Sequence, residues 1–243
     1  MSLPTLSLPT FELILPSTKK KLLLRPYTVK EQTLILMASN SDDVEEITTI
    51  IKQILSACIL TPNFKLDDLT IFDLQFIFLR LRAKSVGEVV SLSYKCQNIP
   101  DVNVKPCGQV NSFDVNLLTI EVAFPEKSNR EIHLNSNLGI KLKYPSLNSA
   151  KILEKWGMIN SYDSLIDALS NDIEYVFDSE KIYDDFTKTE LAEFVSNFGV
   201  NEANKLYDFY ANQPTLQYTL KFKCKKCGYE EDILLEGMAS FLE

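Results

Sequence analysis

The chain has 243 residues, of which 45% are hydrophobic and 24% charged, and its formal net charge is -8 at pH 7. This composition is typical of a soluble globular protein with one large or two small domains. The negative balance argues against a protein that works by neutralising phosphates, so we expect no nucleic-acid partner. The N-terminal segment has no basic region or continuous apolar core, and no window approaches the roughly 20 apolar residues that cross a bilayer. We therefore expect no secretory signal, no membrane partner, and a protein kept in a cytoplasm where thiols stay reduced.

Residues 1–27 predict an extended arm followed by two strands. Prolines at positions 4, 9 and 16 remove backbone donors and hold the chain extended. The runs 11–15 and 22–27 are strand-like, and Lys19–Lys21 between them reads as a solvated turn. An arm of this kind packs either on its own domain or on a neighbouring protein.

Helices are predicted between residues 28 and 87. The first begins at Thr28, which forms a capping box with Glu31. The second carries an apolar stripe at spacings of three and four that includes Cys58, so we expect Cys58 to be a small buried side chain. The third, residues 71–84, is apolar around nearly its whole circumference and ends before Gly87, which indicates a central helix.

The middle of the chain predicts further strands. Strand-like runs occupy residues 118–124, 131–134 and 140–144, with turn residues between them. The lone histidine, His133, alternates with its apolar neighbours and is expected to be an ordinary strand residue.

A helical insertion is predicted to follow. Residues 148–213 read as helical almost throughout, and the candidate helices are 149–156, 161–177, 188–197 and 202–210. An acidic cluster in this region lacks the spacing of a calcium loop, so we expect a solvated acidic surface. Its members are Asp178, Glu180, Asp184 and Asp185.

Four of the five cysteines fall in two pairs that are far apart in the sequence. Cys224 and Cys227 form a CxxCG motif between strand-like runs, a spacing that lets both thiolates reach one ion while the glycine permits a tight turn. Cys96 and Cys107 also lie between strand-like runs, and Cys107 is followed by glycine; residues 97–106 between them can loop out as an insertion if the two cysteines stay adjacent. Two such hairpins facing each other place four thiolates around one Zn²⁺, so the sequence predicts a closed, structural split zinc ribbon.

Other readings of the cysteines stay open. A cytoplasmic redox CxxC normally starts a helix, whereas this motif sits at a hairpin, and free thiols or a degenerate site are a further alternative. A zinc-ribbon module that binds nucleic acid is another, because lysines flank the second pair at positions 221, 223, 225 and 226. The chain has no phosphate-binding glycine loop, nucleophile elbow or histidine-rich metal set. We therefore predict that it is not an enzyme and has no catalytic residues.

Together these patterns predict an α+β fold in three parts. Residues 1–87 form the arm, the strand pair and the helices, residues 88–147 and 214–243 form the cysteine hairpins, and residues 148–213 form the helical insertion. The surfaces expected to contact partners are the arm, the insertion and the apolar C-terminal tail. The partner-binding residues predicted in the arm and the tail are Leu3, Pro4, Leu8, Pro9, Phe241 and Leu242.

Four ordered segments carry a resemblance to a known family. They are LPST at Leu15–Thr18, RPYTVKE at Arg25–Glu31, RAKSVGE at Arg82–Glu88 and KYPS at Lys143–Ser146. The chain resembles the baseplate hub family of contractile-tailed bacteriophages of the T-even type, in which these elements take the form LPSTGK, RPF-x-x-K-E, RAKSVGE and KYPS. It departs from that pattern at Lys19, where the family has glycine, at Tyr27, where it has phenylalanine, and in the stretched first cysteine pair.

The resemblance implies a structural or assembly protein of the central baseplate hub. Such a protein folds in the cytoplasm of the infected bacterium, and its expected later location is the baseplate of the virion tail. The implied partners are other baseplate hub and tail proteins, with self-association left open, and no active site is implied. A subunit that stays in the particle and a factor that leaves it are both compatible with the sequence.

Overall fold

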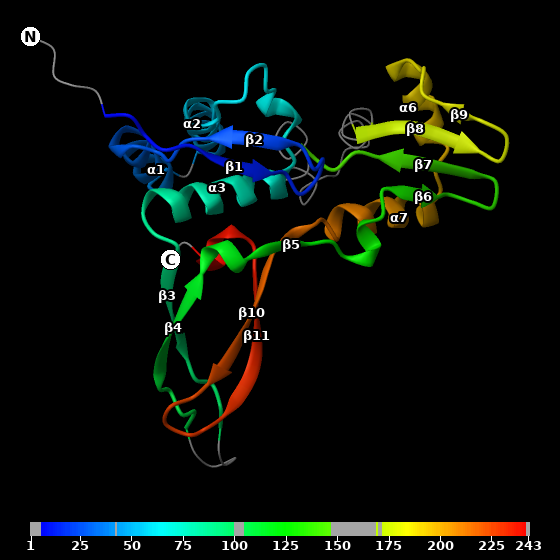
Figure 1. Cartoon of the computed structure of the whole chain (residues 1–243). Helices are drawn as coiled ribbons and strands as arrows, with labels where there is room; N and C mark the ends of the chain where they lie inside the picture. Colours follow the sequence, from blue (N-terminus) through cyan, green and yellow to red (C-terminus); the bar gives the residue numbers. More distant parts are fainter. Residues whose placement is uncertain (1–5, 42, 100–104, 147–168, 170–171, 242–243) are drawn as a thin grey trace, which may run out of the picture. The chain divides into compact units, whose positions relative to one another are not determined.

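The computed structural model describes residues 6–41, 43–99, 105–146, 169 and 172–241. The chain forms two compact units. Unit 1 contains residues 1–66, 72–122 and 215–243, and unit 2 contains residues 67–71 and 123–214. This division differs from the expected three parts, because the strand region after residue 123 belongs with the segment predicted as a helical insertion. Figure 1 shows the elements in both units.

Unit 1 begins with a small sheet covered by helices. Strands β1 (Phe11–Ile14) and β2 (Lys21–Leu24) pair antiparallel, and helices α1 (Val29–Ser39) and α2 (Val44–Cys58) follow. The backbone N–H of Arg25 donates to the carbonyl of Cys58 over 3.0 Å, which joins the end of β2 to the end of α2. Cys58 is fully buried in the core, as the apolar stripe of α2 predicts.

Helix α3 (Ile71–Ser85) is the central helix that the sequence predicts, and most of its side chains are buried. Two of those buried side chains are charged, and each has partners. Asp73 accepts hydrogen bonds from the backbone N–H and the hydroxyl of Ser17. Arg80 donates to the carbonyls of Leu117 and Ile120 and to the carboxylate of Glu121. Because a buried charge is costly unless it is hydrogen-bonded, these contacts determine which segments pack against α3.

Two long hairpins complete unit 1 and lie side by side in Figure 1. Strands β3 (Val89–Lys95) and β4 (Val110–Asn116) form one, and β10 (Thr215–Lys223) and β11 (Glu230–Glu236) form the other. The second hairpin is extended by β5 (Glu121–Ala123) into a sheet of order β11-β10-β5. Short 3-10 turns occur at η1 (Leu66–Asp68), η2 (Leu117–Thr119) and η4 (Met238–Phe241).

Unit 2 is a four-stranded antiparallel sheet with helices. The strand order is β6-β7-β8-β9, and the strands span Glu131–His133, Leu138–Leu142, Ile173–Asp178 and Ile182–Tyr183. The turn η3 (Glu126–Ser128) precedes the sheet, and helices α6 (Lys188–Ser196) and α7 (Val200–Ala211) follow it. Ile140, Leu142 and Val176 of the sheet belong to one buried cluster with Leu191 of α6 and Phe209 of α7.

The predicted helix 161–177 is wrong at its C-terminal end, because residues 173–178 form strand β8. This segment is rich in β-branched and aromatic residues, which suit a pleated surface. It pairs with β7, and Phe177 lies opposite Gly139. The pairing with β7 overrides the helical pattern, and local spacing does not reveal it because the partner strand is distant in the sequence. The candidate helix 149–156 lies outside the described residues, whereas the predicted helices 188–197 and 202–210 are confirmed as α6 and α7.

The α+β fold class is therefore confirmed, with small antiparallel sheets and helices in both units. Within the part of the chain that the structure describes, no helix is both long and apolar enough to span a bilayer.

Candidate metal centre

The four paired cysteines lie at the ends of the two hairpins of unit 1. Cys96 directly follows β3, and Cys107 lies shortly before β4. Cys224 directly follows β10, and Cys227 lies in the turn that leads into β11. The two hairpins have their turns at the same end (Figure 1), so these positions meet although they are far apart in the sequence.

The four sulfur atoms lie close enough together to hold one metal ion. The Sγ atoms of Cys96 and Cys227 are 3.7 Å apart, and those of Cys107 and Cys224 are 3.8 Å apart. All four lie within 4.8 Å of one another. Zinc–sulfur bonds of about 2.3 Å in tetrahedral geometry place sulfurs about 3.8 Å apart, so these residues fit one zinc ion.

Both hairpin ends use the same backbone bond to form the turn. The N–H of Gly228 donates to the carbonyl of Cys224, and the N–H of Gly108 donates to the carbonyl of Cys96, each over 3.0 Å. Both glycines have positive φ, 74° and 65°, a conformation that glycine adopts without steric cost. The stretched first pair therefore closes like the CxxC pair.

Residues on either side of the insertion in the first cysteine pair are held close together. The N–H of Cys107 donates to the carbonyl of Asn98 over 2.8 Å. This bond holds Cys107 close to Cys96, and the predicted loop falls partly on residues 100–104, which lie outside the described residues. The spacing of the first pair is thus compatible with a common site.

Two asparagines support the sulfurs, and the sequence reasoning did not identify them. The Nδ2 of Asn111 donates to the Sγ of Cys224 over 3.8 Å, and its Oδ1 accepts from the N–H of Lys225 over 3.0 Å. The Nδ2 of Asn98 donates to the Sγ of Cys227 over 3.7 Å. Both asparagines come from the first hairpin, and both contact the second. The signal that could have identified Asn111 is its polar side chain at a strand position that is buried.

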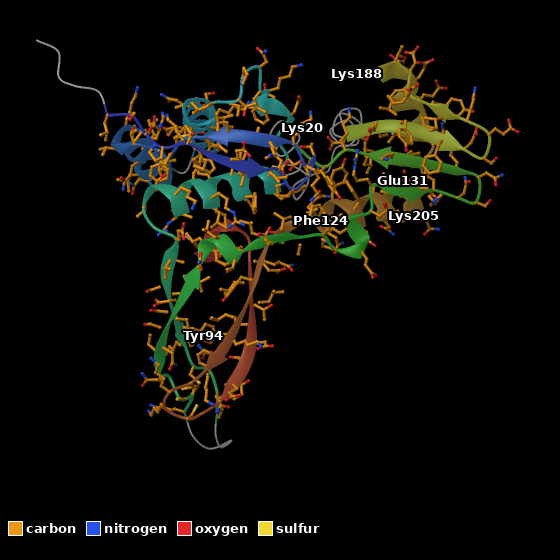
Figure 2. The ribbon with its side chains drawn as sticks, in the orientation of Figure 1. Lys20, Tyr94, Phe124, Glu131, Lys188 and Lys205 are labelled. Atoms are coloured by element: carbon orange, nitrogen blue, oxygen red, sulfur yellow. The ribbon has the colours of Figure 1, made fainter. Side chains whose placement is uncertain are left out.

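Aromatic side chains fill the space behind the sulfurs. The ring of Phe222 in β10 lies 5.0 Å from that of Tyr94 and 5.5 Å from that of Phe113, between ring centroids. Tyr94, labelled in Figure 2, extends from β3, and Phe113 comes from β4. With Cys96 and Cys224 these residues form one small buried cluster. One edge-to-face and one tilted ring pair therefore pack the two hairpins against each other behind the cysteines.

The electrostatics of the thiols differ from one hairpin to the other. Hydrogen bonds from the backbone N–H groups of Cys227 and Lys226 lower the pKa of Cys224 to about 6. Burial raises the pKa of Cys96 to about 12. A metal ion binds cysteine as thiolate, so binding at this site would release protons. Four thiolates occupy every position of a tetrahedral ion and leave none for water, which suits a structural site rather than a catalytic one.

The residues predicted to bind partners lie only partly within the described part of the chain. Leu8 is half-buried and Pro9 is exposed, whereas Phe241 is fully buried within unit 1. Leu3, Pro4 and Leu242 lie outside the described residues. Contact of these residues with partners stays a prediction.

The remaining candidates have ordinary structural surroundings. His133 lies exposed in β6 with its ring 5.4 Å from that of Phe177, so it is the strand residue that was expected. Asp178 accepts from the N–H groups of Glu180 and Lys181 and from the hydroxyl of Tyr183. The carboxylate thus builds the turn between β8 and β9.

Comparison with known proteins places the chain in a family. A family described as T4 bacteriophage base plate protein matches residues 8–243, which is nearly the whole chain. No curated protein and no solved structure shows a significant match. The chain therefore belongs to the T4 bacteriophage base plate protein family.

Proposed function

We propose that this baseplate protein is a structural or assembly component of the central hub, that it acts through protein–protein contacts, and that its four cysteines hold a structural Zn²⁺. The family match supports a baseplate role. The narrower assignment to the hub rests on the four ordered motifs that resemble the hub family. The observation that supports a structural role is that the residues of these motifs lie in contacts that hold the fold together.

In unit 1, residues of three motifs form contacts that stabilise the fold. Ser17 of LPST donates its backbone N–H to Asp73 over 3.0 Å. Arg25 of RPYTVKE forms an ion pair of 3.0 Å with Glu31 of the same motif. The backbone N–H of Tyr27 donates to the hydroxyl of Ser85, in RAKSVGE, over 2.9 Å. These residues contact each other or α3.

The fourth motif has a similar role within unit 2. Tyr144 of KYPS stacks on Phe209 with an angle of 11° between the rings. The carbonyl of Pro145 accepts from the N–H of Ile71 over 3.3 Å, so it satisfies a donor at the start of α3. Motifs whose side chains and backbone groups support packing are what a scaffold needs, and they assign no reaction.

The zinc part of the proposal rests on the sulfur geometry. Thiolates from two hairpins, set within 4.8 Å of one another, would repel each other without a cation between them. A bound Zn²⁺ would supply that charge and cross-link the hairpins. The asparagine contacts and the backbone N–H groups would orient the sulfurs around it.

The proposed partners are the other hub and tail proteins of the same phage, met first in the cytoplasm of the infected bacterium and then in the tail baseplate. The test is to express the chain with each hub protein of that phage and to measure complex formation by size-exclusion chromatography with light scattering. Co-elution with a hub protein at a fixed ratio is the expected result.

Mass spectrometry of purified tails then distinguishes the two roles. Recovery of the chain in finished tails identifies a subunit, and its recovery only in assembly intermediates identifies a factor that leaves. A chain that elutes alone in the presence of every hub protein contradicts the proposal.

A further inference from the structure

Helix α1 carries apolar side chains on two sides, and only one side is covered. Leu34 and Ile35 are half-buried on the inner side, with the buried carboxylate of Glu31 one turn earlier. On the outer side, Val29 is 79% exposed, Leu36 59% and Met37 53%. A surface helix normally places polar residues on its outer side. We call Val29, Leu36 and Met37 the outer face of α1.

The outer face continues into an open groove between α1 and α2. Leu36 and Met37 line it together with Thr33 and Asn40 of the α1 side and Asp43 and Glu46 of the α2 side, around a volume of about 640 Å³. Contiguous exposed apolar surface bounded by polar groups is typical of protein interaction sites. Methionine suits such a surface because its flexible side chain adapts to the partner.

The charge of the groove indicates what kind of segment it receives. Asp43 and Glu46 are both exposed at its rim. The C-terminus of α1, which has no basic residue in its last turn, adds a partial negative charge. Asp43 accepts the backbone N–H of Glu46 over 3.4 Å at the start of α2, whose partial positive charge offsets part of this, but both carboxylates keep their full charge. Ser41 donates to Glu46 over 2.6 Å, which holds that carboxylate in place without removing its charge. The rim is therefore negative beside an apolar floor.

We propose that the groove between α1 and α2 docks a basic amphipathic helix of another baseplate protein. Leu36 and Met37 receive the apolar side of that helix, and Asp43 and Glu46 pair with its lysines or arginines. This mode places anchors three and four residues apart along the ligand into an apolar groove. The inference rests on the proposed function and names the surface that serves it.

The test uses the full-length chain and synthetic peptides as probes. The peptides cover each basic amphipathic segment of the other baseplate proteins of the same phage, and each has a version with every lysine and arginine replaced by glutamate. Fluorescence anisotropy measures the affinities. We expect at least one basic peptide to bind and its acidic version to fail.

Two groove variants and one control locate the site. Leu36→Gln with Met37→Gln is expected to weaken binding at least about tenfold, because it removes the apolar floor. Glu46→Gln keeps the hydrogen-bond acceptor but loses the charge, and is expected to weaken binding about threefold at low salt and not at high salt. Val89→Gln with Leu234→Gln alters residues of similar exposure on the hairpins and should leave binding unchanged.

Several outcomes would overturn the inference. Absence of binding by every basic peptide, equal binding by the acidic versions, or equal losses from the groove and hairpin variants would each do so. Loss of self-association of the chain alone in the Leu36→Gln/Met37→Gln variant would assign the groove to a second copy instead. If full-length hub proteins bind the chain and the groove variants have no effect, the docking site is wrong while the hub function stands. If no hub protein binds at all, the function itself fails.

Discussion

The Sγ atoms of Cys96 and Cys227 lie 3.7 Å apart although the two residues are 131 positions apart in the chain. Nearly all of unit 2 lies between them in the sequence. Closing the site therefore joins the first hairpin to a strand pair that the chain reaches only after building a second unit. A metal ion at this point would stabilise unit 1 by closing a very long loop.

The first prediction concerns metal content and thiol reactivity. We expect protein purified without chelator to contain one zinc per chain and to show no reactive thiol, because Cys58 is also buried. A strong chelator should release the metal and expose the four paired cysteines, and denaturant should then expose Cys58. Elemental analysis and a colorimetric thiol assay measure both quantities.

The matched variants are Cys224→Ser and Cys58→Ala. The first should lose the zinc and lower the melting temperature, and the second should keep a full complement of zinc. Freely reactive paired cysteines in protein without metal would contradict the zinc site.

The second prediction tests Asn111, which joins the two hairpins. Its replacement by alanine removes the side-chain acceptor of the Lys225 N–H and one of the donors to the Sγ of Cys224. We expect zinc affinity to fall about 10- to 100-fold, as for other groups that orient metal ligands. Competition with a chromophoric chelator measures the affinity. Ser112→Ala, at the neighbouring exposed position of β4, is the control and should change little.

The third prediction concerns Glu31 and acid stability. Burial of Glu31 raises its pKa, but hydrogen bonds from Arg25 and Thr28 outweigh this effect and lower the pKa to about 2. A carboxylate whose pKa is lower in the folded state stabilises the fold above its ordinary pKa of about 4.3. This contribution is lost as the pH falls from there towards 2.

Glu31→Gln should therefore destabilise the protein by about 2 kcal/mol at pH 7. The difference between wild type and variant should shrink as the pH falls below the ordinary value, as measured by urea unfolding at several pH values. Glu12→Gln breaks the exposed pair with Lys21 and should cost under about 1 kcal/mol. If the loss of stability in Glu31→Gln were the same at every pH, the lowered pKa of Glu31 would not be what stabilises the fold.

The fourth prediction concerns Gly139, which lies opposite Phe177 across β7 and β8. A Cβ atom at this position would overlap the ring of Phe177. We expect Gly139→Ala to destabilise unit 2 by about 1–3 kcal/mol, the usual cost of overpacking. Thermal unfolding measures the loss. Adding Phe177→Leu should recover part of it, and full additivity of the two substitutions would exclude a direct clash.

The fifth prediction concerns Lys19, where the resembling family has glycine. Lys19 has a φ of 59°, which is unfavourable for a residue with a side chain. Lys19→Gly is expected to be neutral or to stabilise the protein by up to about 1 kcal/mol, since the strain is relieved at the expense of chain entropy. Lys20→Gly, in the same turn without positive φ, should destabilise instead. Chemical denaturation of the two variants provides the comparison.

Local cues in the sequence were sufficient for several elements. The capping box of Thr28 and Glu31 occurs as expected, with the N–H of Thr28 donating to Glu31 over 2.7 Å. The apolar stripe placed Cys58 in the core, and the apolar circumference of residues 71–84 identified α3 as central. These features depend on residues within a few turns of each other, so their spacing contains the information. The cysteine pairs were visible for the same reason, because each is local to one hairpin.

Contacts between distant segments were decided only by the tertiary structure. Residues 173–178 form a strand because β7 supplies backbone partners and Gly139 makes room for Phe177, and neither fact is local. Asn111 supports a sulfur of the other hairpin because both hairpins pack around Phe222. The sequence by itself therefore determined most of the elements, with the end of the predicted helix 161–177 as an exception, and the candidate ligands of this protein. Their assembly into two units and one four-sulfur cluster depended on packing between distant segments. The free energy of that packing cannot be inferred from the local propensities of any short stretch of sequence.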